Sequence, residues 1–148
     1  ERTKLWTARH DAYWAGLALK PGCQTFSTDL CVPISRLAEC IAETKADIEA
    51  TGLVAPIVGH VGDGNFHVLP LFHPDDTAEI DKVKAFVGRL VDRTLAMEGT
   101  ASGEHGVGQG KMKYLEAEHG RAALDLMVAI KRALDPKGIL NPGKIIAV

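Results

Sequence analysis

Cysteine, aromatic residues and net charge are all scarce in this sequence. Its 148 residues include 3 cysteines, 5% aromatic residues and a formal net charge of −2. The cysteines, Cys23, Cys31 and Cys40, are odd in number and form no C-x-x-C pair, which argues against a disulfide framework or a zinc knuckle. We expect them to be ordinary thiols in a reducing compartment. The near-neutral charge gives no overall attraction to nucleic acid or to an anionic membrane surface, so neither is expected as a partner.

Long hydrophobic runs are absent as well. No apolar run approaches the roughly 20 residues that span a bilayer, and no basic-then-apolar leader precedes the first pattern. Hydrophobic residues make up 46% and charged residues 24%, which is typical of one folded globular domain with its own core. The chain starts at Glu1 and enters a helical pattern at once. We therefore expect that an N-terminal partner domain lies outside this sequence.

The spacing of apolar residues predicts four helical regions and three strands. The helices fall over residues 4–19, between Pro33 and Gly52, over 75–98, and over 111–134 with a division near Gly120. The strands fall over 23–32, 54–61 and 66–72, and residues 135–144 form a turn-rich tail. Since the strands do not alternate regularly with helices, the pattern favours an α+β fold: an antiparallel sheet with helices packed against it, over residues 1–148.

Two histidines flank a predicted hairpin turn. Asp63-Gly64 between apolar strands is a strong hairpin signal, because both central turn residues favour positive φ. A turn at 63–64 pairs residue 62 with 65, 61 with 66, and His60 directly with His67. Opposed Cβ atoms lie about 4.5–5.5 Å apart, within reach of one metal ion. The alternative is a pair of exposed histidines beside a tight turn.

A glycine-rich stretch, S-G-E-H-G-V-G (102–108), adds two more candidates. Glu104 offers a carboxylate, and two histidines with one carboxylate leave open positions on a metal, as in a catalytic site. His105 is a candidate general base, because imidazole titrates near neutral pH. The alternative is a flexible loop with a solvated Glu-His pair. The glycines match neither a dinucleotide-binding nor a P-loop pattern. Arg9 is either a clamp for a carboxylate or a surface arginine.

Three ordered motifs together resemble a known family. They are H-V-G-D-G-N-F-H (60–67), S-G-E-H-G-V-G (102–108) and L-D-P-K-G-I-L-N-P-G-K (134–144). The chain resembles the C-terminal domain of FAD-linked 2-hydroxy-acid oxidases and dehydrogenases of the vanillyl-alcohol-oxidase type. This branch includes D-lactate dehydrogenase, the glycolate oxidase flavin subunit and D-2-hydroxyglutarate dehydrogenase. Residues 6–22 and 27–37 look closest to the cytochrome-linked, mitochondrial-type D-lactate dehydrogenases.

The resemblance implies a cap and substrate domain whose FAD is bound mainly by the missing N-terminal domain. It implies that His60, His67 and Glu104 bind a divalent metal, zinc or manganese. It further implies that His105 is the base, that Arg9 binds the substrate carboxylate, and that Asn141 lies near the flavin. The implied electron acceptor is a cytochrome or the quinone pool, and the implied location is a bacterial cytoplasm or a mitochondrion. The fragment alone is expected to be inactive and to expose an apolar surface, which leaves a homodimer open.

Two departures from the family bear on the substrate. Members that act on 2-hydroxyglutarate have a lysine where Ser27 aligns and an asparagine where Leu69 stands. A second carboxylate would then be buried without a partner, so we expect a short or apolar 2-hydroxy acid such as D-lactate. Two rival functions stay open: a metal-dependent hydrolase that uses the same His-His-Glu site to activate water, and a non-catalytic binding or dimerisation module.

Overall fold

The structure is a computed structural model that describes residues 2–147. Its elements, in chain order, are α1 (Arg2–His10), α2 (Ala12–Ala18), β1 (Gln24–Thr25), β2 (Leu30–Cys31), α3 (Ile34–Thr51), β3 (Ile57–His60), β4 (Asn65–Val68), β5 (Leu71–Phe72), α4 (Thr77–Ala96), a 3₁₀ turn (Met112–Tyr114), α5 (Leu115–His119) and α6 (Arg121–Leu134). All strand pairs are antiparallel, in the orders β2-β4-β3 and β1-β5. The predicted α+β fold with an antiparallel sheet is confirmed.

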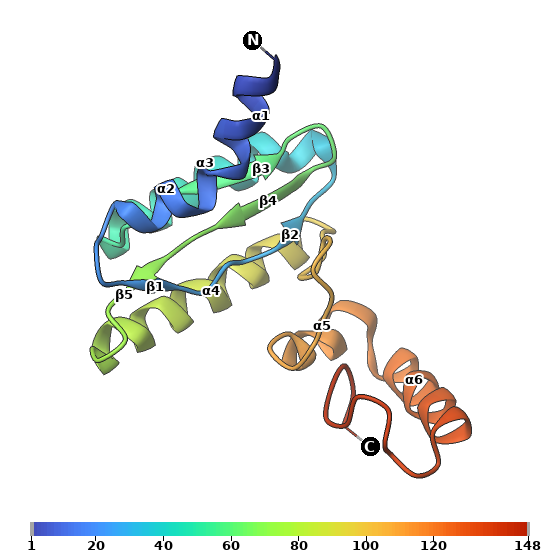
Figure 1. The fold of residues 1–148 in the computed structure, drawn as a ribbon. Helices are drawn as coiled ribbons and strands as arrows, with labels where there is room; N and C mark the ends of the chain where they lie inside the picture. Colours follow the sequence, from blue (N-terminus) through green and yellow to red (C-terminus); the bar gives the residue numbers. More distant parts are fainter. Residues whose placement is uncertain (1, 148) are drawn as a thin grey trace.

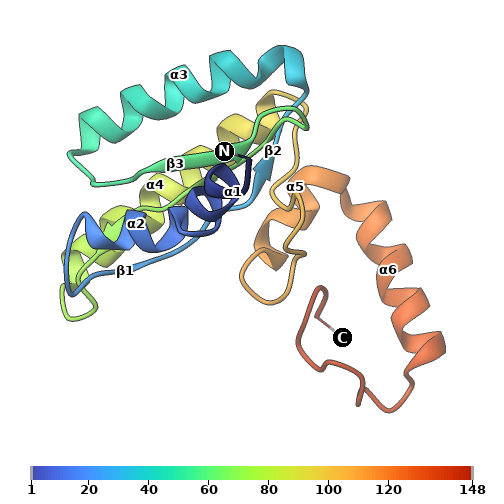
Figure 2. The ribbon, with the colours of Figure 1, turned by 45° about the horizontal axis from the view of Figure 1, so that its top comes forward.

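The strands lie between two layers of helices. Figures 1 and 2 show α4 on one side of the strands and α2 on the other, with α5, α6 and the C-terminal tail extending away from this body. The tail turns back toward the glycine-rich loop, where the Ile145 amide donates to the Gly108 carbonyl at 2.7 Å. In the part of the chain that is described, no helix is both long and apolar enough to cross a membrane.

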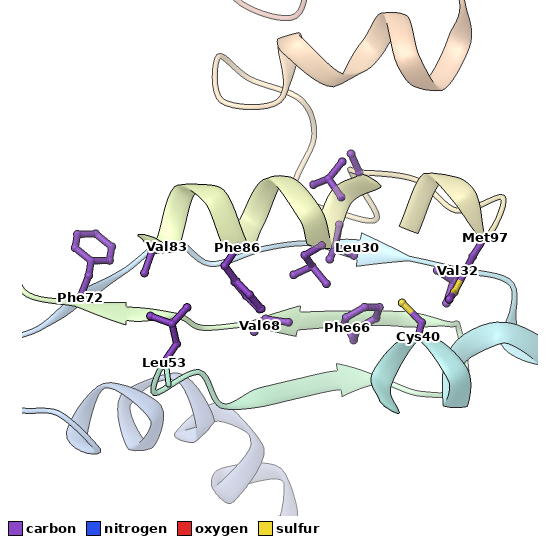
Figure 3. Packing of buried hydrophobic residues seen from close by; sticks show 13 residues of the cluster. Leu30, Val32, Cys40, Leu53, Phe66, Val68, Phe72, Val83, Phe86 and Met97 are labelled. Atoms are coloured by element: carbon purple, nitrogen blue, oxygen red, sulfur yellow. The ribbon is translucent and has the colours of Figure 1, made fainter. Parts of the chain in front are cut away.

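The core fills the space between the strands and the helices α3 and α4. Phe66 and Val68 of β4 point toward Phe86 of α4, and Cys40 of α3 lies at the edge of this cluster (Figure 3). Because side chains alternate along a strand, Asn65 and His67 face the other side, away from the core cluster. This alternation makes one face of β4 structural and leaves the other for the candidate site.

Local sequence signals located most helices correctly. The helix predicted between Pro33 and Gly52 is α3, and Gly52 ends it in the left-handed conformation at φ 66°. The helix predicted over 75–98 is α4, and the Asp76 carboxylate caps it by accepting from the Glu79 amide at 3.0 Å. The division at Gly120 is confirmed between α5 and α6. The helix predicted over 4–19 is instead two helices, which Asp11 separates.

The strand predicted over 23–32 is interrupted. Only β1 and β2 pair within it, and residues 26–29 leave the ladder. Thr28 replaces the regular ladder bonds to β4 at this point. Its amide donates to the Val68 carbonyl at 3.1 Å, and its hydroxyl accepts from the Val68 amide at 2.8 Å. This interruption turns Asp29 inward, which the alternation pattern did not predict.

The predicted hairpin register is wrong by two residues. His60 pairs with Asn65 and Val58 with His67, across a four-residue loop over 61–64. The Asp63 amide donates to the His60 carbonyl at 2.8 Å, and of Asp63 and Gly64 only Gly64 has a positive φ, at 76°. A two-residue hairpin turn needs positive φ at its first central residue, and in type I′ at both, which Asp63 does not have. Because side chains repeat every two residues, the shift leaves His60 and His67 on the same face, as diagonal neighbours.

Two arginines of α4 clamp a carboxylate of α3. The Asp47 side chain is 11% exposed and accepts from Arg89 Nη2 at 2.6 Å and from Arg93 Nη2 at 3.2 Å. Hydrogen bonds from Arg89, and then from Arg93, lower the pKa of the Asp47 carboxyl against the opposing effect of burial. The two helices that cover the core are therefore joined by a charge cluster as well as by apolar packing.

This cluster predicts pH-dependent stability. A carboxyl with a lowered folded-state pKa stabilises the fold above its unfolded pKa of about 3.9, and loses that contribution as the pH falls through the folded value. We expect Asp47→Asn to cost about 1–3 kcal/mol of unfolding free energy at neutral pH and distinctly less near pH 3. Denaturant unfolding of this chain at both pH values measures it, with the exposed Asp92→Asn as the control. An equal cost at both pH values would contradict the assignment.

Candidate metal centre

Three imidazoles surround one carboxylate oxygen. Glu104 Oε1 lies 3.1 Å from His67 Nε2, 3.4 Å from His60 Nε2 and 3.7 Å from His105 Nε2. The rings of His67 and His105 stack with centroids 5.0 Å apart and an interplanar angle of 7°. All four side chains singled out in the sequence are therefore brought together at one point.

Three segments supply these groups. His60 ends β3 and His67 lies in β4, so the hairpin alone places both rings on one face. Glu104 and His105 follow the bridge that joins Thr100 to Cys31 at the end of β2, so the sheet also fixes where the glycine-rich loop begins. The site thus lies across the order β3, β4, β2, with the loop beside the central strand.

The tautomer of His67 is set by its surroundings. Its Nδ1 lies 2.8 Å from the Thr28 carbonyl oxygen, which can only accept, so Nδ1 carries the proton that it donates. In the neutral ring the Nε2 lone pair then faces the Glu104 carboxylate at 3.1 Å. Two lone-pair groups at this distance repel unless a positive centre, a proton or a metal ion, lies between them. A ligand imidazole held by a carbonyl in this way is typical of metal sites.

The spacing of the ligand atoms fits a metal ion. Atoms bound at about 2.0–2.1 Å to a tetrahedral zinc lie about 3.3 Å from one another. The distances from Glu104 Oε1 to His67 and His60, 3.1 and 3.4 Å, agree with that value. One ligand atom each of Asp29, His67, Glu104 and His105 also lie within 4.8 Å of one another. The residues therefore fit a divalent ion with His67 and Glu104 as ligands. A third ligand is either His105, which belongs to this group, or His60, which lies 3.4 Å from Glu104 Oε1 but outside the group, with Arg9 Nη2 3.1 Å from its Nε2.

Sequence reasoning missed Asp29, which underlies the loop. Its side chain is 0% exposed, and it accepts from the Glu104 and His105 amides, from Asn65 Nδ2 and from Lys111 Nζ. Burial raises the pKa of the Asp29 carboxyl, but the donors of His105, Asn65, Lys111 and Glu104 outweigh it and hold the pKa well below its usual range. The signal in the sequence was an acidic residue directly before the apolar run Leu30-Cys31-Val32, since a carboxylate drawn into a core requires partners.

Gly103 allows the loop to pack closely against the Asp29 carboxylate. A Cβ at this position would lie 2.1 Å from Asn65 Nδ2 and 2.9 Å from Asp29 Oδ1. Any side chain would therefore push the loop away from Asp29, and with it the two residues that follow. A glycine is required here for space rather than for backbone conformation.

Arg9 reaches the site from α1. Its Nη2 lies 2.5 Å from His60 Nδ1 and 3.1 Å from His60 Nε2, and its guanidinium lies over the Trp6 ring at 5.2 Å. The structure therefore brings Arg9 beside His60, and its predicted role in binding a carboxylate stays a prediction. Asn141 is elsewhere: it lies in the tail at φ 48° and its Oδ1 accepts from Lys144 at 3.0 Å. Within residues 2–147 no hydrogen bond connects Asn141 with the imidazoles.

The two substrate-selecting positions are separated in the fold. Leu69 is 1% exposed and lies under α2, since a Cβ on Gly16 would be 3.0 Å from Leu69 Cδ1. Ser27 instead lines a cavity of about 370 Å³ with Val87 and Val91 of α4, and this cavity includes neither the site imidazoles nor Glu104. Leu69, but not Ser27, is therefore on the side of the strands that the N-terminal helices cover.

Comparison with known proteins decides the family. The family described as FAD linked oxidases, C-terminal domain, matches residues 1–145. This chain belongs to that family. A solved structure, 4-ethylphenol oxidase from Gulosibacter chungangensis, superposes with a TM-score of 0.69 over 97% of this chain and 30% of that chain, at 21% identity. That likeness confirms the fold of an FAD-linked oxidase C-terminal domain.

The FAD-linked oxidase C-terminal domain has close relatives in curated proteins. It is 52% identical to the probable mitochondrial D-lactate dehydrogenase of Danio rerio, over 98% of this chain and 29% of that protein. It is 45% identical to the mitochondrial D-lactate dehydrogenase [cytochrome] of Arabidopsis thaliana, over 98% and 26%. It is 34% identical to a glycolate oxidase subunit of Bacillus subtilis, over 99% and 31%. The chain therefore spans less than a third of the length of these relatives.

Proposed function

We propose that this domain forms the substrate and metal site of an FAD-dependent D-2-hydroxy-acid dehydrogenase that oxidises D-lactate to pyruvate. Membership of the FAD-linked oxidase family and the mitochondrial D-lactate dehydrogenases among its relatives support the class of reaction. The observation that carries the proposal is the convergence of three imidazoles on the Glu104 carboxylate, a donor set suited to a divalent cation.

His60, His67 and Glu104 would hold the metal, zinc or manganese. A divalent ion bound there supplies Lewis acidity toward the substrate hydroxyl, and FAD, held mainly by the rest of the protein, supplies a hydride acceptor. The chain's own residues provide the remaining functions. The Thr28 carbonyl keeps the His67 proton on Nδ1, so that Nε2 stays available to the cation. His105 is proposed as the base that receives the hydroxyl proton at Nε2, the atom that faces Glu104.

Arg9 is proposed to bind the substrate carboxylate. Its planar guanidinium lies beside His60, so a carboxylate paired with it would have its α-carbon next to the metal ligands. Fixing the carboxylate orients the reacting carbon, which lowers the entropic part of the barrier. Asn141 stays a prediction for the flavin-facing side.

The substrate is proposed to be short or apolar at its distal end. Leu69 offers no polar partner on the face that α2 covers, so a second carboxylate there would lose its hydration without compensation. The mitochondrial D-lactate dehydrogenases among the relatives, one of them named [cytochrome], support D-lactate as substrate, a cytochrome as acceptor and a mitochondrion as location. The quinone pool as acceptor and a bacterial cytoplasm as location stay predictions.

Reduction of the flavin in the full-length protein tests this function. We expect D-lactate to reduce the flavin in stopped-flow experiments, and D-2-hydroxyglutarate to react about 100-fold more slowly, the loss typical of an unpaired buried polar group. L-lactate should also react more slowly, because with its carboxylate and hydroxyl held in place its C2 hydrogen points in another direction. Chelation should abolish the D-lactate reaction, and added zinc or manganese should restore it. Equal rates with D-2-hydroxyglutarate would reject the substrate assignment, and full activity after verified removal of metal would reject the metal site.

A further inference from the structure

We propose that Asp29 is a positioning residue, whose buried carboxylate anchors the loop 103–105 to β4 and so holds Glu104 beside the imidazoles. As far as the metal is concerned, this rests on the function proposed above. Asp29 touches neither substrate nor metal in this assignment. It acts through the backbone of the loop that carries Glu104 and His105.

Three consecutive amides of the loop donate to this one residue. The Gly103 amide donates to the Asp29 carbonyl at 3.2 Å. The Glu104 amide donates to both carboxylate oxygens, at 3.0 and 2.9 Å, and the His105 amide donates to Oδ2 at 2.8 Å. Glu104 and His105 are separated from Asp29 by 75 and 76 positions in the chain, so these are long-range contacts. Hydrogen bonds to a charged acceptor are the stronger kind, so Asp29 determines the path of this short segment.

The same carboxylate is tied to the strand that carries His67. Asn65 Nδ2 donates to Asp29 Oδ1 at 3.0 Å, and Asn65 is the register partner of His60 in the β3–β4 pair. Beyond the loop, Lys111 Nζ donates to Asp29 Oδ2 at 3.0 Å and supplies the balancing positive charge. Loop and histidine strand are therefore held against one central group.

Asp29 is an anchor rather than a metal ligand. One of its oxygens lies within 4.8 Å of the ligand atoms of His67, Glu104 and His105. However, Oδ1 already accepts from Asn65 and Glu104, and Oδ2 accepts from Glu104, His105 and Lys111. These donors occupy the lone pairs that a metal would need.

Glu104 depends on this anchor because its side chain is 49% exposed. Within residues 2–147 its carboxylate contacts only the three imidazoles, and no backbone amide donates to it. Gly103 restricts the position of the loop backbone further, since there is no space for a side chain between it and Asn65 and Asp29. Displacing the backbone would move the ligand atom directly.

The test compares Asp29→Asn with Asp47→Asn in the full-length protein. Asparagine keeps the shape of Asp29 but places an NH₂ donor against amide or ammonium donors, so part of the anchor is lost. Asp47 is also a multiply bonded carboxylate, with a side chain 11% exposed, but it joins α3 to α4 away from the loop. Zinc affinity is measured by competition with a chromogenic chelator. We expect it to fall about 10- to 100-fold in Asp29→Asn, as it does when other groups that orient metal ligands are removed. In Asp47→Asn we expect it to stay within about twofold of the wild-type value.

A second readout separates this proposal from the proposed function. Hydrogen exchange in peptides covering residues 103–105 should become faster in Asp29→Asn and stay unchanged in Asp47→Asn. If neither exchange nor zinc affinity differs from wild type, the proposal is overturned. Faster exchange with unchanged zinc affinity overturns the positioning role. If the wild-type protein binds no zinc but exchange at 103–105 still responds, the metal function fails while the anchor is supported.

A milder variant keeps the test decisive should Asp29→Asn not fold. Lys111→Met removes one donor and the balancing charge while Asp29 itself is kept. We expect about a 10-fold loss of zinc affinity with faster exchange at 103–105. Lys113→Met, which alters a lysine that lies over the Tyr114 ring, is the matched control. Identical behaviour of the two lysine variants would overturn the proposal.

Discussion

Glu104→Ala is expected to remove the bound metal and to lower kcat in the full-length protein by about 10³-fold or more. Lewis-acid stabilisation of the reacting oxygen is worth several kcal/mol, and each 1.36 kcal/mol, roughly, is a factor of 10 in rate. Glu104 Oε1 is the atom around which His60, His67 and His105 converge, at 3.4, 3.1 and 3.7 Å. Without it, the imidazoles have no anionic partner to complete the site.

The variant isolates the side chain from the loop. The backbone amide that bonds to Asp29 is kept, and the side chain is 49% exposed, so the fold should be little affected. Metal content by elemental analysis and steady-state turnover of D-lactate measure the effect. Glu116→Ala, at an exposed carboxylate of α5, is the control. We expect His60→Ala to lose metal and turnover in the same way. Normal metal content with a normal rate in either site variant would refute the ligand assignment.

His105→Ala is expected to lower kcat by about 10²- to 10⁴-fold while the metal stays bound. Loss of a positioned general base has this typical size. The His105 side chain is 50% exposed and stacks on His67, so its removal should leave the more buried ring in place. Retained metal with lost turnover is the pattern that distinguishes a base from a ligand.

The same measurement decides between His60 and His105 as the third ligand. Both Nε2 atoms lie near Glu104 Oε1, His60 at 3.4 Å and His105 at 3.7 Å. If His105→Ala loses the metal and His60→Ala retains it, the two roles are exchanged. His10→Ala, at an exposed histidine next to Arg9, serves as the control for removing an imidazole from this side of the molecule.

The face shared by His60 and His67 was predictable, but their pairing was not. The two-residue period of a strand assigns both side chains to the same face under any register shift of two, so the error in the turn was harmless to the site. The turn itself depends on Gly64, which lies against the Val32 carbonyl, where a Cβ would be only 2.1 Å away. That contact comes from the residue after β2, and the local pattern around Asp63-Gly64 does not indicate it.

Asp29 shows the opposite case. The alternation of residues 23–32 suited a plain strand, whereas the structure breaks it after Thr25 so that Asp29 can accept from a loop 75 residues further along. Periodicity describes which side a residue faces and carries no information about a distant partner. The approach of Arg9 to His60, 51 positions apart, was likewise a matter of helix packing and not of spacing.

By itself the sequence determined the α3 and α4 helices with their Gly52 and Asp76 ends, the common face of the two hairpin histidines, and the motifs of the family to which the chain belongs. These follow from interactions between near neighbours, which repeat with the period of the backbone. The loop register, the burial of Asp29 and the distances around Glu104 became visible only in the folded chain. Those depend on contacts between segments far apart in the chain, whose geometry exists only once the core has packed.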